Sequence, residues 1–171
     1  MKKVIMVVLA LAMILSMAAC GEQVKQPLGV DDSNIQIVNQ FTEFDTLDNA
    51  AEIAGFEMST PTAVPNWVDD VVIRAVENEM IEMIYTGTDQ QELRVRKANG
   101  NEDVSGVYES FDEVKEVSIN GQNVTLKINE GQIYVAIWTE DGYCYAVSTT
   151  EGLDQTHIED LVSGINQSLI F

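Results

Sequence analysis

Two dipeptides that favour tight turns, Asn120-Gly121 and Asp141-Gly142, most constrain the fold of this 171-residue chain, because each lies between two short apolar runs. Asn, Asp and Gly tolerate the positive φ angles of a two-residue hairpin turn, so each dipeptide predicts an antiparallel hairpin. Both faces of the second hairpin are apolar, which predicts central strands that are covered on two sides. The register that follows pairs Trp138 with Tyr145, Ala136 with Val147 and Ile137 with Ala146.

Further elements surround these hairpins. Runs rich in Val and Ile predict strands over 67–77, 80–86, 92–98, 114–119, 124–128, 133–139 and 143–149. A short helix is predicted to begin at an N-cap, Asp45 or Thr46, and to end at Gly55. An amphipathic helix follows the N-cap Asp154, with an apolar stripe formed by Ile158, Leu161, Val162 and Ile165. We therefore expect residues 45–171 to form one α+β domain. It should be a curved, mostly antiparallel meander sheet of six to seven strands with an N-terminal short helix and a C-terminal amphipathic helix.

The N-terminus has the pattern of a bacterial lipoprotein signal. Lys2 and Lys3 precede an apolar run over 4–19, and Ala18-Ala19 lies directly before Cys20. The run is shorter than the roughly 20 residues that a membrane span needs. We expect a signal peptide over 1–19, a lipidated Cys20, and a flexible tether over 20–44 that holds the domain on the outer face of the cell membrane of a Gram-positive cell. The alternatives are a plain secretory signal and an uncleaved anchor.

The chain is strongly acidic. Without Lys2 and Lys3, seven basic residues remain against 28 acidic ones, which gives a charge of −21. Such a surface repels nucleic acid, so no nucleic-acid partner is expected. The membrane, reached through the lipid on Cys20, and a protein or envelope ligand are the partners we expect. One cysteine, Cys144, remains beyond Cys20, and a buried free thiol is expected there.

The stretch from Ala50 to Ile165 resembles a known family, the bacterial domains of unknown function numbered 4367. The resemblance is carried by the Ala-rich helix that ends in Gly-Phe at 50–56, by Pro61, Pro65 and Trp67, by the segment 96–106, by the hairpin 136–145 and by the final helix. Cys144 stands where the family usually has a small polar residue. The resemblance implies a secreted or membrane-anchored extracytoplasmic domain. Related domains form the outer part of some anti-sigma factors, so it also implies sensing or protein binding, but no reaction.

No motif in the sequence predicts catalysis. His157 is the single histidine and lies in the first turn of the last helix, where protonated imidazole is disfavoured. Carboxylates are so abundant that any pair at glycosidase spacing is uninformative. Asn99, Asn101 and Asp103 alternate as calcium ligands do, but Val104 stands where a calcium loop needs glycine. We expect no catalytic residue, no metal site and no cofactor.

One patch is unusual for so acidic a chain. Arg94, Arg96 and Lys97 are three of its few basic residues, and they are followed by Glu102 and Asp103. Arg94 and Arg96 share a strand face. The patch is either a structural cluster of ion pairs or a partner-contact surface that binds a carboxylate or another anion. The aromatic residues Tyr134, Trp138, Tyr143 and Tyr145 either line a groove or belong to the core.

The sequence therefore favours a surface-anchored lipoprotein with a non-enzymatic binding or sensing domain. The alternative is a hydrolase that acts on an envelope polymer through carboxylates.

Overall fold

Positive φ angles confirm both predicted turns. They are 51° at Asn120, 84° at Gly121, 51° at Asp141 and 83° at Gly142. The structure, a computed structural model, describes residues 40–166. The predicted signal peptide 1–19, Cys20 and the tether as far as residue 39 lie outside the described residues. A third turn of the same kind, at Glu130-Gly131, has φ angles of 50° and 77° and was not predicted.

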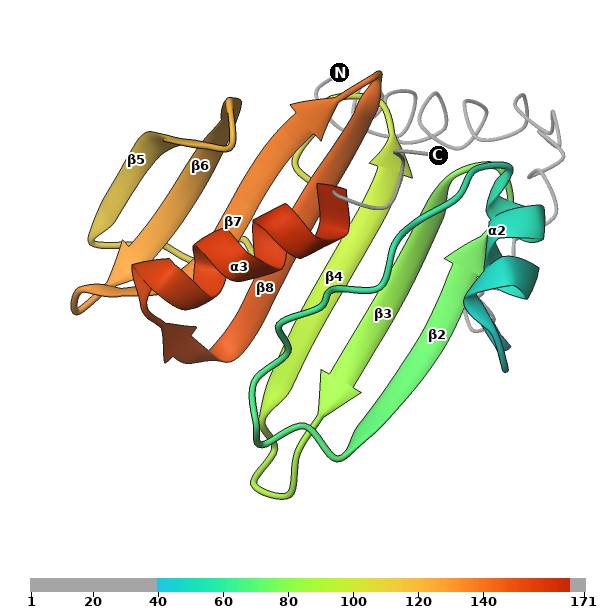
Figure 1. Cartoon of the computed structure of the whole chain (residues 1–171), viewed down its shortest axis with the longest axis horizontal. Coiled ribbons are helices and arrows are strands. Elements are labelled where there is room, and N and C mark those ends of the chain that lie inside the picture. Colours follow the sequence, from blue (N-terminus) through green and yellow to red (C-terminus); the bar gives the residue numbers. More distant parts are fainter. Residues whose placement is uncertain (1–39, 167–171) are drawn as a thin grey trace, which may run out of the picture. The chain divides into compact units, whose positions relative to one another are not determined.

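The described residues form one antiparallel sheet of eight strands with two helices (Figure 1). The strands are β1 (Thr42–Phe44), β2 (Asp70–Val76), β3 (Met80–Thr86), β4 (Glu92–Asn99), β5 (Glu113–Ile119), β6 (Gln122–Asn129), β7 (Gln132–Glu140) and β8 (Tyr143–Leu153). Eight strands correct the predicted six to seven. The additional strand, β1, lies in the segment that we expected to be tether, and it pairs with β2.

The order of the strands in the sheet, β1-β2-β3-β4-β8-β7-β6-β5, is not a single meander. Two four-stranded meanders adjoin along β4 and β8, and the connection 100–112 carries the chain across to the far edge. The burial of the strands is consistent with this order. Most of β8 is buried on both faces, so it needs a neighbour on each side. Strand β5 is largely exposed and is suited to an edge.

Both helices begin at predicted capping residues, and the short helix ends at the predicted Gly55. In α2 (Leu47–Ala54), the Thr46 side chain accepts a hydrogen bond from the Asn49 amide, and Gly55 ends the helix at φ 80°. In α3 (Gln155–Asn166), Asp154 Oδ1 accepts a hydrogen bond from the His157 amide at 2.9 Å. The placement of the short helix differs from the prediction, because β1 precedes it.

The two faces of the sheet are covered differently. The helical face carries α2, α3 and the segment between α2 and β2, which passes so close to α3 that a Cβ at Gly164 would lie 2.5 Å from Thr62 Oγ1. In Figure 1, α3 lies in front of β7 and β8. Trp138 and Tyr145 stack on this face with their ring centroids 5.2 Å apart. They lie opposite each other, as predicted. Ile158, Leu161, Val162 and Ile165 of α3 are buried in the same core.

The other side of the sheet, which we call the connection face, is crossed by the connection 100–112. Arg96, on this face, donates a hydrogen bond from Nη1 to the Val104 carbonyl oxygen at 2.7 Å. Lys127 on β6 reaches Asp103 at 2.8 Å. These contacts hold the connection against the strands, and the candidate functional site lies beneath it.

Candidate functional site

A buried carboxylate organises the connection face. Glu82 on β3 lies directly opposite Arg74 on β2 and Arg96 on β4, and its side chain is fully buried. Arg74 Nε forms an ion pair with Glu82 Oε2, and Arg96 Nε donates to Oε1 at 2.7 Å. Arg94 Nε approaches Oε1 at 3.3 Å. A buried charge is tolerated only when it is paired. The need to pair Glu82 therefore explains why arginines lie on both strands that flank β3.

The connection fits closely over this cluster. Gly106 has a φ of 71°, and a Cβ there would lie 2.5 Å from Arg96 Nη1, so this position requires glycine. Burial acts to raise the pKa of Asp103, but hydrogen bonds from Lys127 and Ser105 outweigh it and hold that pKa below its usual range. The connection is therefore anchored by charge-assisted contacts at Val104 and Asp103.

A bulge in β8 opens a space beside the connection. Val135 pairs with Ser148, but Ile133 pairs with Leu153, so residues 149–152 leave the ladder with β7. Strand β7 also bulges against β6. Lys127 pairs with Val135 and Ile128 pairs with Ile133, so Tyr134 has no partner residue in β6. A Cβ at Gly152 would overlap Gln132, which makes glycine necessary in the bulge. Bulges of this kind re-aim side chains and are common beside functional sites.

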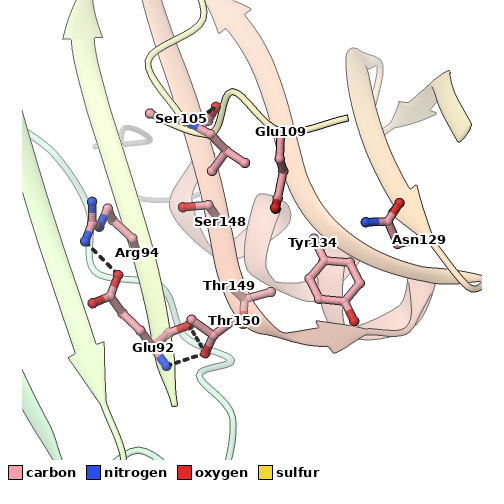
Figure 2. Close-up of a pocket in the computed structure, with 11 residues that line it drawn as sticks. Glu92, Arg94, Ser105, Glu109, Asn129, Tyr134, Ser148, Thr149 and Thr150 are labelled. Atoms are coloured by element: carbon pink, nitrogen blue, oxygen red, sulfur yellow. Dashed lines mark hydrogen bonds and ion pairs between the residues drawn. The ribbon is translucent and has the colours of Figure 1, made fainter. Parts of the chain in front are cut away.

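The space is a polar cavity of about 490 Å³ (Figure 2). Its walls come from the start of β4, the connection, the end of β6, the bulge of β7 and the bulge of β8. Figure 2 shows Glu109 reaching from the connection toward the strands that carry Ser148 and Tyr134. The lining residues are Glu92, Arg94, Ser105, Gly106, Val107, Glu109, Asn129, Tyr134, Ser148, Thr149 and Thr150.

One wall of the cavity is held by internal contacts. Arg94 Nη2 donates to Glu92 Oε1 at 2.7 Å, and the Glu92 amide donates to Thr150 Oγ1 at 2.8 Å. Arg94 Nε is buried without a hydrogen-bond partner, because its 3.3 Å approach to Glu82 is an ion pair that lacks hydrogen-bond geometry. This unpaired nitrogen belongs to the buried cluster around Glu82, while the guanidinium of Arg94 also lines the cavity.

Other lining groups have no protein partner. Within residues 40–166, no hydrogen bond or ion pair engages the Glu109 carboxylate or the hydroxyl groups of Tyr134 and Ser148. Ser148 is only 9% exposed, and its side chain lines the cavity. Glu109 is exposed and Tyr134 is half-buried, so water solvates these groups until a ligand replaces it.

The structure separates the basic patch that the sequence suggested. Arg94 lines the cavity, Arg96 lies beneath the connection, Asp103 pairs with Lys127 and Glu102 is exposed. Lys97 lies on the helical face, where its Nζ is 4.3 Å from the centroid of the Tyr143 ring and donates to the Glu57 carbonyl oxygen at 2.6 Å. Burial lowers the pKa of Lys97, against the raising effect of nearby carboxylates.

The remaining candidates from the sequence are also separated. Trp138 and Tyr145 belong to the core, whereas Tyr134 lines the cavity on the other face. His157 is exposed and pairs with Asp154 at 2.9 Å. Burial raises the pKa of the Cys144 thiol. Among residues 40–166, no group of three His, Cys, Asp or Glu side chains is arranged to hold a metal ion. In the same part of the chain, no helix is long and apolar enough to cross a membrane.

The cavity was not predicted from the sequence. A signal for it was present in the polar run Ser148-Thr149-Thr150-Glu151-Gly152, which interrupts an apolar strand and ends in glycine. Glycine within a strand pattern indicates a bulge.

Comparison with known proteins gives a family match. The family model described as "Domain of unknown function (DUF4367)" matches residues 66–165, which is more than half of the chain and contains every residue of the cavity. No curated protein and no solved structure matches the chain.

Proposed function

The chain belongs to the family of domains of unknown function numbered 4367, and from that premise we propose that it is a lipid-anchored, non-enzymatic binding or sensing domain. Its ligand, an envelope component or part of a protein, enters the cavity on the connection face. One observation supports this proposal above all. The Glu109 carboxylate and the hydroxyl groups of Ser148 and Tyr134 line one preformed cavity, and within the described residues nothing engages them.

The position of the cavity supports binding by a preorganised site. Arg94 is held by Glu82 and Glu92, and Thr150 is fixed by the Glu92 backbone. Groups that are already ordered lose little conformational entropy when a ligand arrives. Part of the basic patch therefore belongs to the proposed site. Arg94 lines the cavity, whereas Arg96 and Asp103 hold the connection over the cavity.

The proposed location rests on the N-terminal sequence. Processing before Cys20 and acylation of its thiol would leave the domain on the outer face of the cell membrane. A net charge of −21 for the remaining chain keeps the domain itself away from anionic headgroups. Binding of a polar envelope ligand is compatible with this placement.

The test is ligand-induced stabilisation of the full chain, purified in detergent. A ligand that binds only the folded state raises the free energy of unfolding by about 2.7 kcal/mol at a concentration of 100 Kd. We expect a soluble digest of the native envelope to raise the Tm of the wild type, and to raise that of Glu109→Gln much less. Glu102→Gln is the matched control, because Glu102 is an exposed residue of the same connection outside the cavity. An equal rise in all three proteins would remove the cavity from the proposal.

The second candidate function is hydrolysis of an envelope polymer, which is favoured by the two carboxylates in the cavity, Glu92 and Glu109. The common glycosidase mechanism needs two carboxyl groups. Glu92 Oε1 already accepts a hydrogen bond from Arg94, which leaves Glu109 as the carboxylate of the cavity that has no protein partner among residues 40–166. Release of new reducing ends from the polymer by the wild type, lost in Glu92→Gln/Glu109→Gln, would establish the hydrolase instead.

A further inference from the structure

We infer that the ligand of the connection-face cavity is an uncharged carbohydrate, an inference that rests on the proposed binding function. Three properties of the lining lead to it: the balance of charge, the mixture of hydrogen-bond donors and acceptors, and the aromatic ring of Tyr134.

The charges of the lining oppose an anionic ligand. The cavity contains two carboxylates, Glu92 and Glu109, and one guanidinium, Arg94. The charge of Arg94 is already shared between Glu82 at 3.3 Å and Glu92 at 2.7 Å. A phosphate or carboxylate would therefore meet a net negative lining in a strongly acidic protein, and Coulomb repulsion disfavours it.

The donors of the lining oppose a simple cation. An ammonium group offers hydrogen-bond donors only, which would leave donors such as Arg94 and the Asn129 amide nitrogen without acceptors. A sugar hydroxyl both donates and accepts. It can donate to the Glu109 carboxylate and accept from Arg94, while Ser148 and Tyr134 can take either role. A polyol is thus the ligand class that satisfies the whole set.

Tyr134, which lines the cavity, supplies the apolar part of such a site. A tyrosine ring offers a flat apolar surface with a polar edge. The C–H face of a pyranose packs against such a ring. The volume of about 490 Å³ is in the usual range of about 300–1,000 Å³ for small-molecule sites.

The experiment is isothermal titration calorimetry of the full chain in detergent with four trisaccharide probes. Cellotriose and N-acetylated chitotriose are uncharged, deacetylated chitotriose is cationic and trigalacturonate is anionic. We expect at least one uncharged probe to bind, with an affinity that changes little between 50 and 500 mM salt. Glu109→Gln should weaken that binding about tenfold or more, since a hydrogen bond to a charged group contributes about 1.5–3 kcal/mol. Tyr134→Ala should weaken it several-fold, and Glu102→Gln should leave it unchanged.

Other outcomes overturn the inference in distinguishable ways. Salt-sensitive binding of trigalacturonate alone, or of the cationic probe alone, would reject the uncharged class while retaining the cavity as a binding site. Binding of none of the four probes, together with Glu109-dependent stabilisation by the envelope digest, would reject the carbohydrate and retain the proposed function. Loss of both signals would reject the carbohydrate and the proposed function together.

Discussion

Glu82 and Arg96 face each other across β3 and β4, with 2.7 Å between Glu82 Oε1 and Arg96 Nε. The Glu82 carboxylate is fully buried. Its Oε1 also contacts Arg94, and its Oε2 contacts Arg74. The arginine uses its remaining donors to reach the connection at Val104. One buried carboxylate thus links three strands to the segment that covers the cavity.

We predict that Glu82→Gln lowers the free energy of unfolding by about 3–5 kcal/mol, because removing one charge of a buried cluster leaves its partners uncompensated. Urea unfolding monitored by tryptophan fluorescence measures this change. Glu92→Gln is the control. It breaks only the more exposed pair with Arg94 and should cost about 1 kcal/mol or less. Similar losses in the two variants would contradict the role of Glu82.

Gly106→Ala should loosen the connection over the strands. The new Cβ would lie 2.5 Å from Arg96 Nη1 at a backbone φ of 71°. The buried Cys144 thiol, which is near the Val104 backbone, should then react faster with a maleimide, as measured by mass spectrometry of the Cys144 peptide. Gly100→Ala separates the clash from backbone strain, because φ there is also positive but no atom lies within 4 Å of its Cβ. Equal labelling rates in both variants would show that the contact with Arg96 does not hold the connection.

Trp138 and Leu161 are expected to be central to stability. Both are buried in the core of the helical face. Trp138→Ala and Leu161→Ala should each lower the free energy of unfolding by about 2–5 kcal/mol, as other large-to-small core substitutions do. Tyr108→Ala, at a 95% exposed site, should change it by about 0.5 kcal/mol or less. Thermal unfolding of the three variants tests the ranking, and an unchanged Tm for both core variants would refute it.

Stability should fall between about pH 10 and pH 12. Burial raises the pKa of Tyr85 from 10.0 to about 12, and it is the main factor that raises the pKa of Tyr145 to the same value. In this window the unfolded chain has lost phenolic protons that the folded chain keeps, so the free energy of unfolding decreases as pH rises. Burial lowers the pKa of Lys97 from 10.5, so below pH 10.5 this residue makes the free energy of unfolding increase as pH rises. The stability difference between wild type and Tyr85→Phe, measured by urea unfolding, should be constant below pH 10 and should shrink above it. A constant difference up to pH 12 would argue against a raised pKa for Tyr85.

Cys20→Ser tests the anchor. We expect the variant to be released from the membrane or to accumulate as an unprocessed precursor, because we propose that Cys20 is the acceptor of the lipid. Cell fractionation and the mass of the N-terminal peptide measure both effects. Cys144→Ser is the control and should remain in the membrane fraction. Normal processing and retention of the Cys20 variant would exclude lipidation at this residue.

The local parts of the fold could be predicted from the sequence, because their determinants lie close together. The Asp141-Gly142 turn gave the register of Trp138 and Tyr145, and Thr46 and Gly55 gave the limits of the short helix. The pairing of β4 with β8 could not be predicted in this way, since it joins residues about fifty positions apart and no turn specifies it.

The candidate site was predicted only in part. Strand alternation alone places Lys97 on the opposite face from Arg94 and Arg96, so the basic patch could have been divided from the sequence. The partner of Arg94 and Arg96 could not, because Glu82 lies on another strand and resembles the many other carboxylates of the chain. The cavity also depends on a bulge in β8 and on the path of the connection, which only the tertiary structure specifies.

The adjacency of β4 and β8 also has a consequence for how the domain reaches its native state. Turns join β2 to β3 and β4 and join β5 to β6, β7 and β8, whereas α2 and the segment after it separate β1 from β2. The seam between β4 and β8 closes the loop of residues 100–142. The entropy lost on closing a loop grows only slowly with its length, so the number of residues in the connection matters less than the contacts that hold it down. Pairing at this seam is long-range in sequence, so it raises the contact order of the domain and slows its folding relative to a sheet made of consecutive hairpins alone.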